Sequence, residues 1–115
     1  MTTIFHIAEA PAWDAAVVSG SYRAPSLSTE GFIHLSTRDQ FVATASRYYG
    51  GRTDLVLLEV DESALPDGSL RYEVSTNDEL FPHLFAPLPV GAVLRVHTFL
   101  PGEHGEFHVP DTLLH

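Results

Sequence analysis

The sequence contains no cysteine and no lysine, and each absence excludes a class of chemistry. Without cysteine there is no disulfide, no thiolate nucleophile and no cysteine-ligated zinc site. Without lysine, no side chain can form the Schiff base that some enzymes use. Because proteins of oxidising compartments commonly carry disulfides, we expect a cytoplasmic protein.

Basic residues and long apolar runs are also scarce. Six arginines stand against fifteen carboxylates, and the formal net charge is −9. Such a field repels a long phosphate backbone, so we expect no bulk nucleic-acid binding, whereas one or two arginines suffice for a small anion. The sequence has no run of 18 apolar residues and no signal-peptide pattern, so we expect no membrane partner.

The remaining composition, 115 residues with 44% hydrophobic content, suits one domain, residues 1–115, with a modest core. Helices preceding most of the strands predict an α+β fold with five or six mostly antiparallel strands. The periodicity and turn residues predict helices at 11–20 and 37–49, strands at 3–8, 32–36, 54–60, 70–74, 92–100 and 105–109, and ordered loops at 21–31 and 75–91.

A histidine stands in the middle of an apolar strand in the motif E-G-F-I-H-L-S-T. Alternation along the strand turns its apolar neighbours towards the core and places His34 and Ser36 on the other face. His6 and His97 lie near the centres of two further expected strands. If these faces align, one side of the sheet becomes a histidine-lined cleft. The alternative is an ordinary solvated sheet face.

The helix that follows this strand offers an anion site. Thr37 and Gln40 fit a capping box, and the helix N-terminus would bring backbone N–H groups and a positive dipole end close to His34. Ser36 and Thr37 are therefore assigned as ligand contacts. Simple helix capping is the alternative reading, and it is favoured for Thr37.

Two further segments carry candidate site residues. His83, in the motif F-P-H-L, is either a packed, hydrogen-bonded histidine or a ligand contact. Glu73, on the strand at 70–74, fits an acid, a base, a ribose ligand or a solvated carboxylate. Tyr22 and Ser26 lie in the long loop at 21–31 and are assigned as ligand contacts, since loops of this length are often functional.

The sequence offers little support for a metal site or for a hydrolase site. The sequence has neither H-E-x-x-H nor H-x-H, and Gly105 argues against a helix that would align His104 with His108. We therefore expect no metal. No G-x-S-x-G and no phosphate-binding glycine motif occurs, which argues against a serine hydrolase and a nucleoside-triphosphate loop.

Several segments together resemble a small bacterial family, domain-of-unknown-function family 952. They cover about residues 3–99 and read I-F-H-I, Y-R-A-P-S-L-S-T-E-G-F-I-H-L-S-T, L-V-L-L-E-V-D, R-Y-E, F-P-H-L-F-A-P-L and A-V-L-R-V. That family is similar in fold to the ADP-ribosyltransferase superfamily, in which a split β-sheet holds NAD. The resemblance implies this fold here, with NAD or an NAD-derived nucleotide as the ligand.

The resemblance also implies roles for single residues. His6 stands where a first-strand histidine binds the adenosine ribose, and His34 with Ser36 where a second motif lies near the nicotinamide ribose. Glu73 or His83 takes the third position, often a glutamate that serves in transfer. We expect a monomer that binds a nucleotide-type ligand, with ADP-ribosyl transfer or related ribose or phosphate chemistry assigned to the second and third positions. The alternative is a non-catalytic binding or protein-interaction module.

Overall fold

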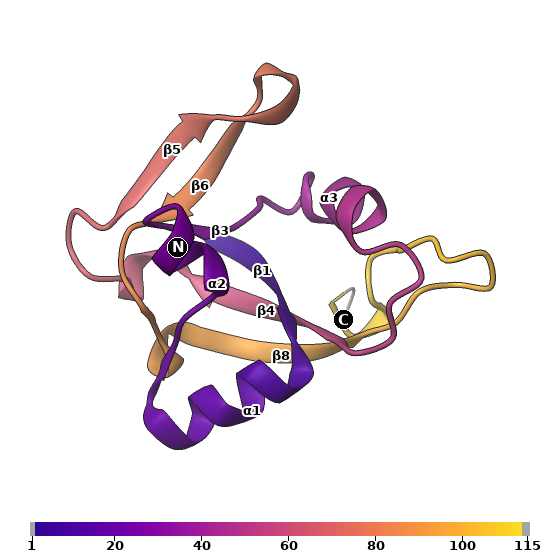
Figure 1. Ribbon diagram of the computed structural model, residues 1–115, viewed down its shortest axis with the longest axis horizontal. Coiled ribbons are helices and arrows are strands. Elements are labelled where there is room, and N and C mark those ends of the chain that lie inside the picture. The colour runs from indigo at the N-terminus through magenta and orange to yellow at the C-terminus, as the bar shows by residue number, and fades with distance from the viewer. Residues whose placement is uncertain (1, 114–115) are drawn as a thin grey trace.

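The computed structural model describes residues 2–113 and has an α+β architecture of three small antiparallel sheets with three short α-helices (Figure 1). The strands are β1 (Thr3–Glu9), β2 (Ser21–Tyr22), β3 (Ile33–His34), β4 (Leu55–Asp61), β5 (Leu70–Val74), β6 (Leu80–Leu84), β7 (Leu88–Pro89) and β8 (Val93–Phe99). The α-helices are α1 (Ala10–Ser19), α2 (Pro25–Thr29) and α3 (Phe41–Tyr48). Short 3₁₀ turns are η1 (Glu62–Ala64), η2 (Thr76–Asp78), η3 (Val90–Ala92) and η4 (Asp111–Leu113).

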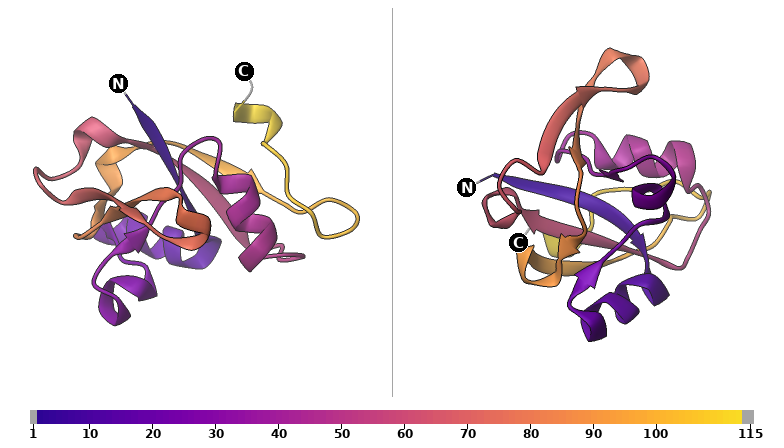
Figure 2. Two further views of the ribbon diagram at one scale, coloured as in Figure 1. Left: turned by 90° about the horizontal axis from the view of Figure 1, so that it is seen from above. Right: turned by 60° about the vertical axis from the view of Figure 1, so that its left-hand side comes forward.

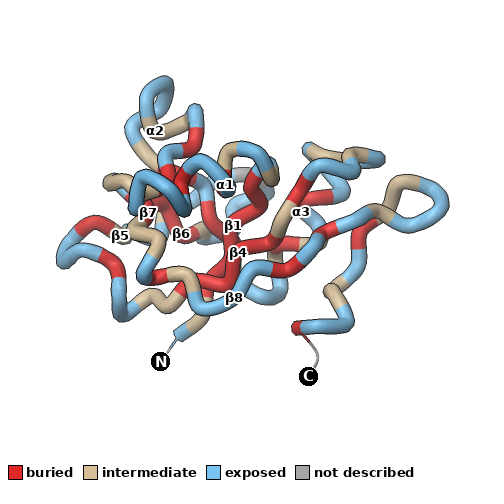
Figure 3. Tube along the Cα trace, turned by 90° about the horizontal axis from the view of Figure 1, so that it is seen from below, coloured by how far each residue is buried: buried red, intermediate tan, exposed pale blue. Residues whose placement is uncertain are grey.

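The largest sheet has the order β1-β4-β8, with β4 in the centre. The sequence of β4, L-V-L-L-E-V-D, is apolar at nearly every position, which is typical of a strand covered on both faces. Figure 3 shows β4 as one of the most continuously buried segments. The strand is therefore the structural centre against which both sides of the molecule pack.

A second sheet, β3-β6-β5, stands at an angle to the first, and its β5–β6 hairpin projects from the body (Figure 2). The two sheets join where Phe5 of β1 and Ser36 exchange two backbone hydrogen bonds of 2.8 Å each. A third ladder pairs β2 with β7. The predicted α+β class with mostly antiparallel strands is confirmed. Within residues 2–113, however, eight strands form three sheets, where one split sheet of five or six strands was expected.

The first sheet has a separate core on each face. Ile4 and Ala8 of β1 pack with Trp13 of α1 on one side. Phe5 and Ile7 pack with Phe41 of α3 on the other. Alternation along β1 thus feeds both cores, and it turns His6 to the α1 side.

The helix ends follow local sequence signals. Pro11 occupies the first turn of α1, and Gly20 ends it in a left-handed conformation with φ of +95°. Before α3, the Gln40 side chain accepts a hydrogen bond of 3.0 Å from the backbone N–H of Thr37. This is one half of the predicted capping box. No helix within residues 2–113 combines the length and apolar character needed to cross a bilayer.

The structure differs from the sequence-based expectation in two segments predicted to be loops. The segment 21–31 contains β2 and the five-residue helix α2, and 75–91 contains β6 and β7. Pro82 obscured β6, because proline lacks an N–H; its carbonyl nevertheless accepts from the Leu35 N–H at 3.0 Å. The predicted strand at 105–109 is wrong, since no strand forms there.

Candidate functional site

A cleft of about 810 Å³ lies between α3 and the segment from Tyr22 to His34. Its floor includes His6 and Ile7 of β1 and the adjoining Ser36. The turn of the β5–β6 hairpin also borders it. Elements from all three sheets and from the three α-helices therefore meet around one hollow, beside the junction of β1 with the segment at Ser36.

Arginines gather in this cleft although the chain is acidic, and four carboxylates line it as well. Arg23, Arg47 and Arg52 line it, which is half of the six arginines. Arg52 is already neutralised, because its Nη2 lies 2.6 Å from a carboxylate oxygen of Glu9 and 2.6 Å from one of Asp54. Within residues 2–113, Arg23 and Arg47 form no ion pair, so their charges remain available to a ligand.

His6 is buried in the cleft floor with both ring nitrogens engaged. Its Nδ1 lies 2.6 Å from the backbone oxygen of His34, and its Nε2 lies 3.0 Å from the hydroxyl of Tyr22. Burial lowers the pKa of His6 to about 4, a shift that the hydrogen bond to the His34 carbonyl only partly offsets. The imidazole is therefore neutral at physiological pH.

Tyr22 connects β2 to this histidine. Burial is the main cause that raises its pKa, with smaller contributions from Tyr49 and Glu9. The rings of Tyr22 and His6 lie 5.2 Å apart between centroids, and Trp13 packs on the tyrosine at 6.4 Å. The phenol is protonated and held in one orientation at the edge of the cleft.

His34 lies on the cleft rim, as the alternation of its strand predicts. Its Nε2 lies 3.1 Å from Glu30, and both side chains are about half exposed. The Phe32 ring contacts the imidazole at 4.7 Å between centroids. An exposed ion pair of this kind contributes little stability, so the imidazole is free to exchange Glu30 for another partner.

His83 and Glu73 form a hydrogen-bonded pair next to the cleft. The His83 Nδ1 lies 2.8 Å from a Glu73 carboxylate oxygen, and Phe32 stacks on the His83 ring at 4.1 Å. The His34 ring meets His83 edge-on at 5.4 Å, because the two are direct partners across β3 and β6. The structure thus brings the three predicted catalytic residues together, but only His34 lines the cleft.

One nitrogen of His83 is left without a partner. The residue is only 4% exposed, and its buried Nε2 makes no hydrogen bond within the described part of the chain. Glu73 accepts the Nδ1–H, and in the neutral imidazole Nε2 carries a lone pair. Glutamate and imidazole in this order are a general-base arrangement.

The predicted serine and threonine contacts, Ser26, Ser36 and Thr37, lie in different surroundings. Ser26 lines the cleft, and its hydroxyl donates to the Phe32 carbonyl at 2.7 Å, which joins α2 to β3. Ser36 lines the cleft floor and is buried. Thr37 is not among the lining residues; its backbone opens the turn before α3, in keeping with the capping alternative.

His97 does not join the other histidines. Register pairs it with Leu57, whereas His6 pairs with Leu58, so the two imidazoles leave opposite faces of the sheet. The expectation of one aligned histidine face is therefore wrong for His97. The cleft is lined by His6 and His34 alone among the histidines of the described segment.

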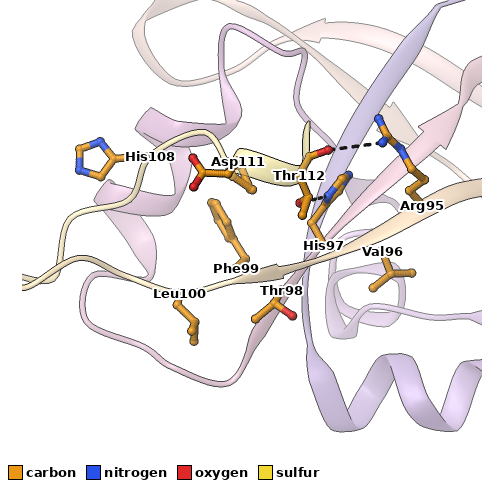
Figure 4. A pocket seen from close by; sticks show the side chains of 10 residues that line it. Arg95, Val96, His97, Thr98, Phe99, Leu100, His108, Asp111 and Thr112 are labelled. Carbon is orange, nitrogen blue, oxygen red and sulfur yellow. Dashed lines mark hydrogen bonds between the residues drawn. The ribbon is translucent and has the colours of Figure 1, made fainter. Parts of the chain in front are cut away.

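His97 belongs instead to a second hollow of about 640 Å³, beside β8 and the C-terminal segment (Figure 4). Its Nδ1 lies 2.6 Å from the Thr112 hydroxyl and its Nε2 lies 3.5 Å from Glu59. Arg95 donates to Glu59 at 2.6 Å, which lowers the pKa of that carboxyl. The contact with Thr112 fastens the segment at residues 111–113 to the sheet.

No cluster of three metal-ligating side chains occurs within residues 2–113.

The cleft residues contributed by α3 were missed by the sequence reasoning. They are Ala43, Thr44, Arg47 and Tyr48, with Gln40 directly before the helix. Their spacing of one, three and four residues marks one helix face, which adjoins the buried face of Phe41 and Ala45. That polar stripe reads equally well as a solvated surface. The polar stripe was therefore visible in the sequence, but it indicates a binding surface only when the opposite wall of the cleft is known.

One protein-family model and solved structures of one bacterial protein match the chain. The family described as "Protein of unknown function (DUF952)" matches residues 7–96. The crystal structure of protein CC0527 from Caulobacter crescentus superimposes with a TM-score of 0.90 at 34% identity, covering 99% of this chain and 100% of that one. The solution NMR structure of CC0527 gives a TM-score of 0.80 at 36% identity, covering 94% and 93%. No curated protein matches the sequence.

Proposed function

Since the chain belongs to the DUF952 family of proteins of unknown function, its activity must be argued from its own cleft, and we propose that this cleft binds a nucleotide or NAD-derived ligand. One observation carries the proposal. In a chain of net charge −9, two unpaired arginines, Arg23 and Arg47, line the same hollow as three of the four tyrosines.

Each group in the cleft suits one part of such a ligand. The planar guanidinium groups of Arg23 and Arg47 match phosphate oxygens in a bidentate manner. Tyr48 and Tyr49 offer aromatic surface for a base. Ser36 and Thr44 offer hydroxyls for sugar oxygens. A volume of about 810 Å³ lies within the range of small-molecule and cofactor sites.

The charges of the cleft also limit what binds. Four carboxylates line it beside the arginines, namely Glu9, Glu30, Asp39 and Glu79. They oppose a continuous run of phosphates but tolerate a single phosphate or diphosphate placed near an arginine. A small ligand therefore fits better than an RNA or DNA strand.

A transfer reaction is the second candidate, and the Glu73–His83 pair favours it. The carboxylate fixes the tautomer of His83, and His34 lies between that pair and the cleft. This arrangement agrees with the resemblance to ADP-ribosyltransferases, in which chemistry occurs at a ribose. NAD cleavage above the buffer rate, lost in His34→Ala and His83→Ala, would support it. Equal rates for the wild type and both variants would leave a non-catalytic binding module.

A calorimetric titration with AMP and ADP-ribose tests the binding proposal. Arg47→Gln should weaken the affinity at least tenfold, which corresponds to about 1.4 kcal/mol, because one charge-assisted contact is lost. Arg38→Gln is the matched control, since Arg38 is exposed and lies outside the cleft lining. If neither compound binds the wild type, or both arginine variants behave alike, the proposal is wrong.

A further inference from the structure

We propose that Tyr22 is the point at which the cleft recognises a hydrogen-bond donor on its ligand, a hydroxyl or an amine, and that His6 imposes this preference by fixing the direction of the tyrosine O–H. The inference rests on the proposed function and refines it. It assigns His6 a positioning role in place of direct contact.

The direction of each hydrogen bond follows from the partners of His6. The backbone oxygen of His34 can only accept, so the His6 Nδ1, 2.6 Å away, must carry the proton. A neutral imidazole has a single N–H, and therefore Nε2 is a lone pair. The Tyr22 hydroxyl, 3.0 Å from Nε2, must donate its proton to it.

The Tyr22 oxygen therefore faces the cleft as an atom that can only accept a hydrogen bond. With its proton directed at His6, the Tyr22 oxygen has only lone pairs left to offer. A phosphate oxygen has only lone pairs as well and is repelled at this point. A ribose hydroxyl or an exocyclic amine, by contrast, can donate to it. Anionic groups belong nearer Arg23 and Arg47, which gives the ligand an orientation.

The surroundings keep this arrangement in place. Tyr22 is 4% exposed and His6 is 7% exposed, yet both line the cleft. Trp13 and His6 contact the tyrosine ring, and β2 pairs with β7 behind it. Rotation of the hydroxyl away from His6 would leave a buried Nε2 without a donor, which costs free energy.

Affinity measurements with three nucleotides test the inference. They are AMP, 2′,3′-dideoxy-AMP, which lacks the ribose hydroxyls, and IMP, which lacks the exocyclic amine. Tyr22→Phe should weaken AMP binding about fivefold to tenfold. One of the two analogues should bind Tyr22→Phe as well as it binds the wild type, because it lacks the donor that Tyr22 accepts. Tyr72→Phe is the matched control, as it removes a hydroxyl that lies outside the cleft lining, and it should leave the affinity for all three nucleotides unchanged.

His6→Asn tests the positioning role with a readout that a purely structural role would not move. The asparagine amide can still donate to the His34 carbonyl, but it leaves the Tyr22 proton free. The variant should therefore lose the discrimination between AMP and the affected analogue while AMP still binds.

Three results would overturn the inference. Equal weakening of all three nucleotides by Tyr22→Phe would reduce the hydroxyl to a packing role, and unchanged AMP affinity would remove it from the site. An Nε2–H tautomer of His6, detected by imidazole ¹⁵N shifts, would reverse the hydrogen bonds. Absence of AMP binding to the wild type would instead remove the proposed function and the inference with it.

Discussion

At the scale of single residues, the cleft depends on a histidine that is prevented from ionising. His6 would take up a proton near pH 6.5 in the unfolded chain, and burial lowers this value to about 4 in the folded protein. Between these values the unfolded state binds more protons than the folded state. The free energy of unfolding therefore falls as the pH decreases through this window.

We predict that the suppressed ionisation of His6 lowers the free energy of unfolding by about 2 to 3 kcal/mol when the pH falls from 7 to 4.5. Urea denaturation of the wild type and His6→Asn at both pH values checks this. The asparagine variant should be less stable than the wild type at pH 7, and this difference should shrink at pH 4.5. Parallel losses in the two proteins would show that His6 titrates normally.

Glu59 presents the opposite case, a buried carboxylate kept ionised. Arg95 donates to it at 2.6 Å and lowers its pKa, so its contribution to stability is present above the ordinary carboxyl pKa and disappears in acid. Arg95→Met should raise that pKa and lower the thermal midpoint. Arg52→Met is the control, since its carboxylate partners are about half exposed and screened by water. Equal effects in thermal melts at pH 6 would contradict the burial argument.

At the scale of secondary-structure elements, α3 forms a wall of the cleft because one aromatic residue anchors it. Phe41 is fully buried and contacts Phe5 and Phe99, with ring centroids 4.9 and 5.9 Å away. The neighbouring helix face presents Thr44 and Arg47 to the cleft. The position of the proposed phosphate contact therefore depends on core packing behind it.

Phe41→Ala should cost about 3 to 5 kcal/mol, because it removes a large ring from a closed core. Val18→Ala, at a position of α1 that is 89% exposed, should change stability by less than about 0.5 kcal/mol. Chemical denaturation of both variants provides the comparison. A similar small change in the two would mean that α3 does not pack as described.

The elements that the sequence could predict are those with one strong local pattern. Apolar periodicity and terminal signals identified α1, α3 and β4, and alternation placed His34 outside the core. The pairing of β3 with β6 could not be predicted, because it joins residues about fifty positions apart and Pro82 argues against a strand. For the same reason no local pattern predicted the contact of His83 with His34, and only the family resemblance placed the two in one site.

At the scale of the whole molecule, the radius of gyration of 13.4 Å is that of a compact domain of this length. The arginines are distributed unevenly over it, since half of them line one cleft of an acidic protein. This arrangement predicts selective binding of small anions, with a polyanion excluded by the remaining surface.

The affinity for AMP should fall several-fold when the salt concentration rises from 0.05 to 0.5 M, because screening weakens the arginine–phosphate attraction. A 20-base-pair DNA duplex should not bind at either concentration. Calorimetry for AMP and fluorescence anisotropy for DNA measure the two effects. Salt-independent AMP binding would argue that the arginines do not contact the phosphate, and tight DNA binding would contradict the charge argument.

The most direct test of the nucleotide cleft is an NMR titration of ¹⁵N-labelled protein with ADP-ribose. We expect saturable shift changes concentrated at residues of the cleft, including Tyr22, Ser36, Thr44 and Arg47. We expect none around His97 and Thr112, which line the second hollow. Shifts centred on the second hollow, or no saturable shifts at millimolar ligand, would contradict it.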